Sequence, residues 1–309
     1  EEGFQEFYTA NKHWLVPYAA FCHLRDRFGT TRFDQWKQHS QYDEAAITRY
    51  VSPRLRHHDQ VRFYYYLQYQ LHLQLETAAR YAHKHGVVLK GDIPIGIARY
   101  SCDAWVNPSL YHLDQQAGAP PDAFAPKGQN WGFPTYNWEQ MKQDGFAWWK
   151  QRFEQMSRYF DAFRIDHVLG FFRIWSIPVT AVEGIMGTFV PAIPVQRQEF
   201  TDRNIWFEYH RYTRPYITEK MLVDIFGDSR GYVEEVFLQS TGFGEYLFQP
   251  DFDTQAKVAA WFAALKPDDD RQWIKQHLLD FHSNIILIEA PGSKGQAFHF
   301  RFAVDQTSS

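Results

Sequence analysis

The stretch Phe163-Arg164-Ile165-Asp166-His167 governs the interpretation of the whole chain. Its apolar residues predict a short buried β-strand, and side chains alternate across a strand, so Arg164 and Asp166 share one face. A buried charge is tolerated only where it is paired or used in chemistry. A guanidinium beside an aspartate at a strand end keeps the carboxylate ionised and oriented, as a nucleophile requires. A purely structural ion pair is the alternative.

A second strand with a carboxylate at its end precedes this one. The spacing of apolar residues predicts a helix over 59–85, stopped by Gly86, and then a buried strand from Val87 to Gly91. Pro94 interrupts ladder pairing just beyond Asp92, which leaves the Asp92 carboxylate at the strand's exit. A helix cap or a turn is the other interpretation of Asp92.

The order helix, strand, loop, helix, strand predicts two parallel strands whose carboxylates meet at one edge. The loop, 117–134, is rich in Gly and Pro, and a second long helix over 138–160 leads into the Arg164 strand. In (β/α)-barrels the chemistry lies at that edge. The same patterns predict helices over 14–28, 43–50, 256–264 and 271–281, and strands over 205–207 and 285–288.

Composition narrows the function. A net charge of −4 without blocks of like charge gives no indication of nucleic acid or of an anionic membrane as partner. No apolar stretch is long enough to span a bilayer, and Cys22 and Cys102 have neither metal-ligand nor redox spacing. We therefore expect a cytoplasmic protein. Aromatic residues make up 18% of the chain, which fits a large core as well as stacking on sugars.

Five motifs in chain order make the chain resemble the 4-α-glucanotransferases (amylomaltases, or disproportionating enzymes) of glycoside hydrolase family 77, in the α-amylase clan. The motifs are Gly91-Asp92-Ile93-Pro94-Ile95, Ser101-Cys102-Asp103-Ala104-Trp105, Gly118-Ala119-Pro120-Pro121-Asp122, the run from Gly128 to Tyr136, and Phe163-Arg164-Ile165-Asp166-His167. From about residue 188 the resemblance is thin. Gly96, where many relatives carry an aromatic residue, and the inserted region after Pro178 point to the longer branch that acts on maltose and branched glucans.

The resemblance implies a role for each site residue. Asp166 is the expected nucleophile, forming a covalent glucosyl ester, and Arg164 is expected to hold it ionised and touch the sugar. Asp92 is expected to help bind the transferred sugar, and Trp131 to stack on the glucan. A retaining enzyme also needs a second group to protonate the leaving oxygen. No metal or organic cofactor is implied.

That second group is not where the family pattern puts it. The family's general acid/base is the Glu of a Glu-Asp-Leu-Gly segment, and this sequence contains no such segment. Glu289, closing the apolar run 285–288, is the best substitute by position. The chain also begins within a helical pattern and without Met. We therefore expect an internal part of a longer enzyme, inactive by itself because the acid/base lies outside it.

The expected fold is α/β, a partial (β/α)8 TIM-type barrel with an α-helical subdomain. The expected divisions are a helical subdomain over 1–60, a central barrel segment over 61–187, and an insertion with further barrel elements over 188–309. The expected activity is retaining transfer of α-1,4-glucan units between maltose, maltooligosaccharides or glycogen-like branched glucans. The alternatives are a catalytically incomplete α-glucan-binding fragment and an α-glucan hydrolase of the same clan.

Overall fold

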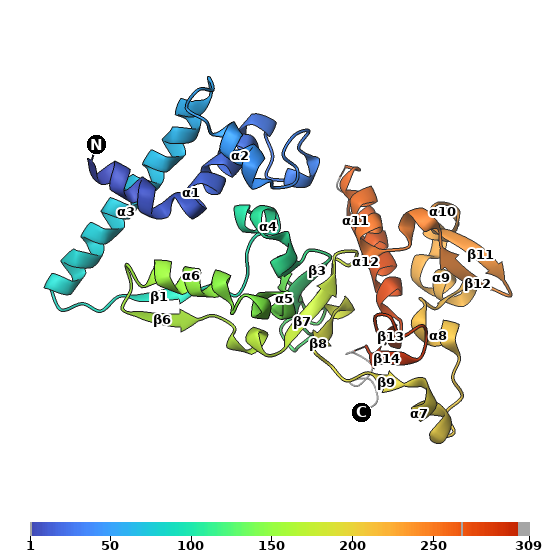
Figure 1. Ribbon diagram of the computed structural model, residues 1–309. Helices are drawn as coiled ribbons and strands as arrows, with labels where there is room; N and C mark the ends of the chain where they lie inside the picture. The colour runs from blue at the N-terminus through green and yellow to red at the C-terminus, as the bar shows by residue number, and fades with distance from the viewer. Residues whose placement is uncertain (1, 267, 302–309) are drawn as a thin grey trace. The chain divides into compact units, whose positions relative to one another are not determined.

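The computed structural model describes residues 2–266 and 268–301, and these fall into two compact units. One unit comprises residues 2–113 and 133–168, and the other comprises residues 114–132 together with the described residues from 169 onward. Figure 1 labels the helices and strands of both units. The divisions expected after residues 60 and 187 stay predictions.

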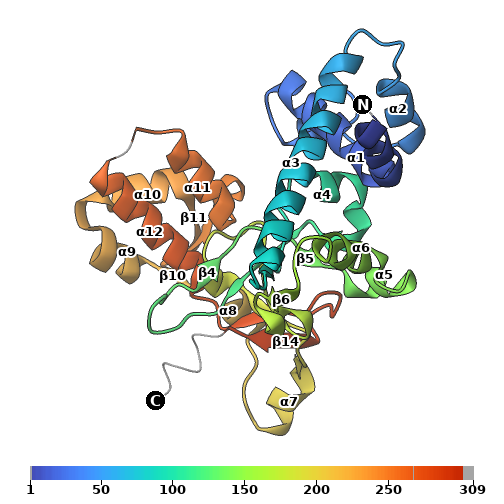
Figure 2. The ribbon, with the colours of Figure 1, turned by 90° about the vertical axis from the view of Figure 1, so that its left-hand side faces the viewer.

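The first unit starts with a group of helices. They are α1 (Glu2–Phe28), α2 (Glu44–Tyr50), α3 (His58–Lys84) and α4 (Cys102–Val106). The two long helices α1 and α3 pack together through buried Leu15, Ala19, Val61 and Tyr65 (Figure 2). The Asp43 carboxylate caps α2 by accepting the Ala46 N–H at 2.7 Å. The predicted helices 43–50 and 59–85 are thus confirmed, whereas α1 starts well before the expected residue 14.

Helix α3 buries only part of its apolar stripe. Val61 and Tyr65 are buried, but Leu71 and Leu75 are 49% and 39% exposed. The latter two lie further round the helix than Val61 and Tyr65, on a side that α1 does not cover. Helical spacing identifies an apolar stripe without saying which part of it another element covers.

The strand pair of the first unit consists of β1 (Lys90–Ile93) and β6 (Ala162–Ile165), which run parallel as predicted. The helix expected over 138–160 is instead two helices, α5 (Trp138–Gln143) and α6 (Ala147–Met156). Gly145 and Phe146 separate them in the left-handed region, with φ of 69° and 61°. Between β1 and β6 in the chain, and before α5, lies a short antiparallel pair, β2 (Tyr111–His112) with β5 (Thr135–Tyr136).

The prediction that these strands are buried holds for one face of β1 only. Gly91 and Ile93 are buried, but Ile165 on β6 is 40% exposed, and Val87 and Val88 are exposed and precede β1. Among the described residues β1 and β6 form a two-stranded sheet, so each strand has one hydrogen-bonded neighbour. Helix α6 covers one side through the edge-to-face contact of Phe153 with Phe163, at 5.7 Å between ring centroids. The opposite side keeps its side chains accessible.

The second unit begins with an antiparallel sheet in the order β4-β3-β7-β8. Its strands are β3 (Gln115–Ala119), β4 (Gln129–Asn130), β7 (Ile174–Pro178) and β8 (Thr188–Val190). The predicted loop 117–134 is therefore wrong at both ends, since it contains part of β3 and all of β4. Gly118 permits this approach, because a Cβ there would lie 2.0 Å from the Gln129 carbonyl oxygen.

The rest of the second unit has its own apolar core, built from Leu222, Phe237, Val258 and Leu278 among others. The elements around it are β10 (Ile217–Thr218), α9 (Glu219–Phe226), α10 (Arg230–Phe237), β11 (Leu238–Gly242), β12 (Glu245–Phe248), α11 (Gln255–Ala263) and α12 (Asp269–Ser283). The strands β9 (Val195–Gln196), β13 (Leu287–Glu289) and β14 (Ala297–Phe300) form a further sheet, next in sequence to α7 (Arg197–Asp202) and α8 (Tyr209–Thr213).

These elements confirm the predicted helices 256–264 and 271–281 and the predicted strand near 285–288. The strand expected over 205–207 is wrong, since those residues have no regular structure. Short 3-10 helices occur at Phe33–Gln35, Pro108–Leu110, Val168–Phe171, Gly184–Met186, Gly227–Ser229 and Pro250–Phe252. Within the described part of the chain, no helix combines the length and apolar character needed to cross a membrane.

Candidate active site

The parallel pairing of β1 and β6 brings two of the expected site residues together. Asp92 and Arg164 are register partners near the carboxyl ends of the two strands. The Arg164 Nη2 donates to the Asp92 Oδ2 at 2.5 Å. The Arg164 side chain is 62% exposed and the Asp92 side chain 53%, so the pair faces solvent rather than a core.

Asp166 follows directly on the same edge. Its backbone N–H donates to the Ile93 carbonyl oxygen at 3.1 Å, which extends the pairing of the two strands by one step. Alternation along the strand puts the Asp166 side chain on the face of Arg164. Asp166 is exposed, and His167 after it adopts a left-handed φ of 49° that turns the chain away from the strand direction.

Two expectations about this edge need correction. The charges are exposed rather than buried, because β6 has only β1 as its hydrogen-bonded neighbour among the described residues. Arg164, expected to pair with Asp166, instead forms its ion pair across the strands with Asp92. In a parallel pair a residue in register is nearer than one two positions along the same strand.

This geometry can bind and react with a polar, uncharged ligand. An exposed ion pair contributes only about 0–1 kcal/mol to folding stability. A purely structural role for the Asp92–Arg164 pair would therefore stabilise the fold very little. The Asp92 and Asp166 carboxylates accept hydrogen bonds, and the Arg164 guanidinium donates several in one plane. Two carboxylates and a guanidinium on one accessible edge suit a polyhydroxylated ligand with an electrophilic carbon.

Trp131 belongs to the second unit. Its backbone N–H donates to the Ala117 carbonyl oxygen at 2.9 Å, and its indole Nε1 donates to the Gln129 Oε1 at 3.0 Å. The side chain is half-buried, and the following Gly132 has a φ of 78°. Strand β4 thus fixes the base of the ring in the Gly-rich segment that the sequence singled out.

Glu289 has the wrong surroundings for a general acid. Its carboxylate accepts hydrogen bonds from the Tyr209 hydroxyl at 2.5 Å and the Gly295 N–H at 2.6 Å. These bonds, that of Tyr209 foremost, lower the pKa of Glu289. A general acid needs a raised pKa to hold its proton near neutrality, so the environment disfavours Glu289 as the missing group.

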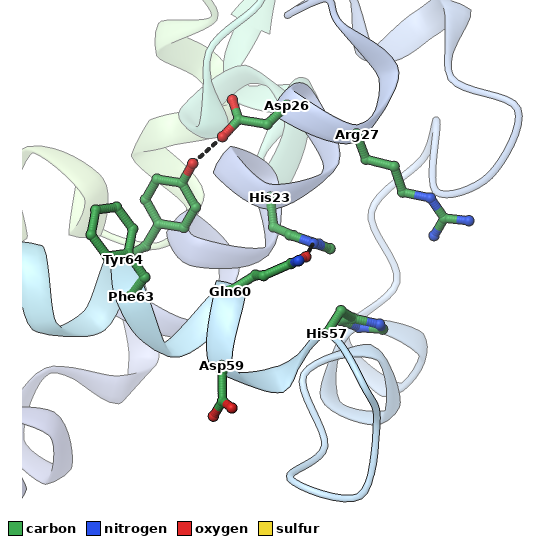
Figure 3. A pocket seen from close by; sticks show the side chains of 8 residues that line it. All are labelled: His23, Asp26, Arg27, His57, Asp59, Gln60, Phe63 and Tyr64. Carbon is green, nitrogen blue, oxygen red and sulfur yellow. Dashed lines mark hydrogen bonds between the residues drawn. The ribbon is translucent and has the colours of Figure 1, made fainter.

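The first unit also contains a hollow, away from the strand ends, that was not expected from the sequence. It lies where the end of α1 meets the start of α3 (Figure 3). The available signal was helical spacing, since residues three and four apart share a face: His23 with Arg27, and Gln60 with Tyr64. Among the described residues no group of three or more His, Cys, Asp or Glu side chains could hold a metal ion.

The fold and the strand-end geometry define a class: an α/β protein with acidic residues at the carboxyl ends of adjacent parallel strands. Within that class the comparison with known families is specific. The model of the 4-alpha-glucanotransferase family matches residues 1–283, and the chain belongs to this family. The match extends well past residue 187, which corrects the expectation that the resemblance is thin beyond residue 188.

Individual relatives agree. The chain is 43% identical to a 4-alpha-glucanotransferase DPE2 of Oryza sativa subsp. japonica, over 99% of this chain and 33% of that protein. It is 35% identical to a 4-alpha-glucanotransferase of Chlamydia pneumoniae, over 56% of this chain and 32% of the relative. Among solved structures, an amylomaltase from Streptococcus agalactiae in complex with acarbose matches with a TM-score of 0.56 and 29% identity, over 61% of this chain and 39% of that one.

The coverage distinguishes the relatives. The chain spans about a third of the length of the rice and Chlamydia proteins. The rice protein aligns with nearly the whole chain, whereas the Chlamydia protein and the solved amylomaltase align with 56% and 61% of it. A substantial part of this chain is therefore shared with the rice protein beyond what those two alignments cover.

Proposed function

We propose that this chain is the central part of a retaining 4-α-glucanotransferase and carries its nucleophile, Asp166. The observation that carries the proposal is the juxtaposition of Asp92, Arg164 and Asp166 on one accessible edge of parallel β1 and β6. Family membership supports the reaction class. We further propose that β1 and β6 are adjacent strands of a (β/α)8 barrel, with the helices before them as its helical subdomain.

The proposed reaction has two displacements. An oxygen of Asp166 attacks C1 of the donor sugar, the C1–O4 bond breaks, and the leaving O4 takes a proton from a general acid outside this chain. The 4-hydroxyl of an acceptor sugar then attacks C1 of the glucosyl ester. Its proton passes to the same group, now acting as a base, and the Asp166 carboxylate is released.

The other residues bind substrate in this proposal. Arg164 and Asp92 hold hydroxyl groups of the donor sugar whose C1 is attacked. Each orients the other through their 2.5 Å hydrogen bond. Trp131 offers its ring for stacking on the glucan. The substrates are α-1,4-glucans: maltose, maltooligosaccharides or branched glucans. The acarbose complex of the Streptococcus agalactiae amylomaltase supports a ligand of oligosaccharide type. We expect a cytoplasmic location and no nucleic-acid or membrane partner.

A variant of the nucleophile tests the proposal. In the complete protein containing this chain, Asp166→Asn should abolish the redistribution of maltotriose into longer and shorter oligosaccharides, measured by chromatography of the products. Binding of maltooligosaccharides should persist, because the amide keeps the shape of the side chain. Asp161→Asn, which changes a carboxylate on the same chain segment that bonds to Leu89 and His83, is the matched control and should retain turnover. Activity in Asp166→Asn refutes the assignment.

The second candidate is a glucan-binding segment without turnover. Its support is the absence of the Glu-Asp-Leu-Gly segment together with the engaged carboxylate of Glu289. The Asp166→Asn variant of the complete protein separates the two, because turnover depends on this carboxylate only if the chain carries the nucleophile. The 309-residue chain alone should in both cases bind glucan and leave maltotriose unchanged, since our proposal places the acid/base outside the chain. Transfer by the isolated chain would show that it holds its own acid/base, and shortening without lengthening would indicate a hydrolase.

A further inference from the structure

The hollow between α1 and α3 has the size and the lining of a ligand site. Its volume is about 890 Å³, within the range of about 300–1,000 Å³ that is usual for small-molecule sites. The end of α1 contributes His23, Asp26 and Arg27. The remaining wall consists of His57 and the first two turns of α3, up to Tyr64. The strand-end carboxylates are not part of it (Figure 3).

The base of the hollow is held in place before any ligand arrives. The buried ring of His23 is fixed from both sides, by the Tyr50 hydroxyl at 2.6 Å and by the Gln60 Oε1 at 2.9 Å. His57 stacks on it at 5.0 Å between ring centroids, and its own Nε2 bonds to the Tyr50 carbonyl oxygen at 2.7 Å. A preformed wall of this kind loses little conformational entropy on binding.

The polar groups favour an uncharged ligand with many hydroxyl groups. The Asp26 carboxylate already accepts from the Arg25 Nε at 2.8 Å and from the Tyr64 hydroxyl. The Asp59 carboxylate accepts hydrogen bonds and opposes an anion such as phosphate, while the Arg27 guanidinium donates and opposes a cation. The Gln60 carbonyl oxygen is engaged by His23, so its amide N–H groups are the ones that donate to a ligand. Donors and acceptors of both signs within one hollow match the alternating hydroxyls of a sugar ring.

The hollow also presents an aromatic surface. Phe63 is 57% exposed, and its ring meets that of Tyr64 edge-on at 5.4 Å and 75°. The Tyr64 hydroxyl donates to the Asp26 carboxylate, which holds the Tyr64 ring in place (Figure 3). An exposed aromatic face beside hydrogen-bonding groups suits the apolar C–H face of a sugar together with its polar rim.

From these features we propose that the α1–α3 hollow binds a short α-1,4-glucan segment, as a second carbohydrate site apart from the one that contains Asp166. The choice of an α-glucan rather than another neutral sugar rests on the proposed function. A second site of this kind would hold a long or branched substrate while one of its chain ends is processed.

Titration of the ¹⁵N-labelled 309-residue chain with maltopentaose tests the site. The backbone resonances of Arg27 and Asp59 and the Gln60 side-chain amide should shift on a common binding curve. Phe63→Ala should raise the dissociation constant obtained from this curve about tenfold, as expected for the loss of one stacking ring. Tyr81→Ala removes a 67% exposed ring from the far end of the same helix and should leave the curve unchanged.

A second pair of variants tests the polar contacts. Asp59→Asn should weaken maltopentaose binding, whereas Glu44→Gln, also in the first turn of a helix, should not. Cellopentaose, with its β-linkages, should bind at least tenfold more weakly. The proposal is overturned if 20 mM maltopentaose leaves these resonances unmoved, if Phe63→Ala binds like the unaltered chain, or if inorganic phosphate shifts the same resonances more strongly than the sugar.

The outcome is separable from that of the proposed function. If the hollow does not bind while resonances of Asp92 and Asp166 still shift, the second site fails and the nucleophile assignment stands. If Asp166→Asn retains turnover while the hollow still binds maltopentaose, the nucleophile assignment fails and the second site stands.

Discussion

Acidification should destabilise the core of the second unit through His282. This residue is 5% exposed on α12, its ring stacks on Phe248 at 3.9 Å between centroids, and its Nε2 bonds to the Phe252 carbonyl oxygen at 2.9 Å. Burial lowers the pKa of His282 from 6.5 to about 4, and the bond to Phe252 opposes that shift only in part. The folded protein therefore keeps the ring neutral where the unfolded chain binds a proton.

The sign and size follow from proton linkage. Above pH 6.5 both states hold a neutral ring, and stability is lost as the pH falls from 6.5 toward 4, because only the unfolded state gains the proton. The loss amounts to about 2 kcal/mol at pH 5 and about 3 kcal/mol at pH 4. Since mutational effects of about 1 kcal/mol are already measurable, this change is large enough to isolate.

Urea unfolding followed by tryptophan fluorescence gives the measurement, since Trp261 packs against this core and Trp273 contacts Phe226 within it. His282→Gln keeps an N–H donor for the Phe252 carbonyl oxygen and removes the titration. It should be less stable at pH 7, because the stacking on Phe248 is lost, yet lose about 2 kcal/mol less than the unaltered chain between pH 7 and pH 5.

His277→Gln, on the same helix, leaves His282 in place and should keep the full loss on acidification. If His282→Gln and the unaltered chain lose equal stability over this interval, the reasoning from burial is wrong.

Two further substitutions test the packing of β3 and the role of the Trp131 ring. Gly118→Ala should lower the free energy of unfolding by about 3 kcal/mol, because its Cβ would lie 2.0 Å from the backbone oxygen of Gln129. Gly231→Ala, which has open space around it, should not lower this free energy, and equal stabilities of the two variants in urea would contradict the prediction. Trp131→Ala should weaken maltopentaose binding about tenfold in calorimetric titration. Trp206→Ala, which removes an 82% exposed ring, should leave the affinity unchanged. If Trp131→Ala also leaves the affinity unchanged, Trp131 has a structural role and does not bind the glucan.

The strand-end arrangement could be predicted from sequence because it depends on local rules. A helix followed by an apolar run identifies each strand, and parallel strands end at the same edge, so Asp92 and Arg164 were expected to lie close together, as they do. Which carboxylate Arg164 would pair with could not be predicted. That choice depends on the register of β1 against β6, and a shift by one residue would have put Asp92 on the other face.

Burial was the larger error, and its cause is not local. The same apolar pattern suits a strand covered on both faces and one covered on a single face, and only the neighbouring elements decide between them. The break at Gly145 was available in principle, since an Asp-Gly pair within a helical pattern is a stop signal. For the α1–α3 hollow, helical spacing indicated only which residues share a face of each helix. The hollow itself depends on the relative position of two helices far apart in sequence.

Exposure of Asp166 changes the role that Arg164 has to play. A buried carboxylate needs an adjacent cation, and this was the role first assigned to Arg164. Asp166 instead faces solvent, and Arg164 bonds to Asp92. In the proposed function the Asp92–Arg164 pair therefore acts on the ligand, holding two hydrogen-bonding groups beside the proposed nucleophile. On this reasoning Arg164→Lys, which keeps the charge but loses the planar fork, impairs sugar binding.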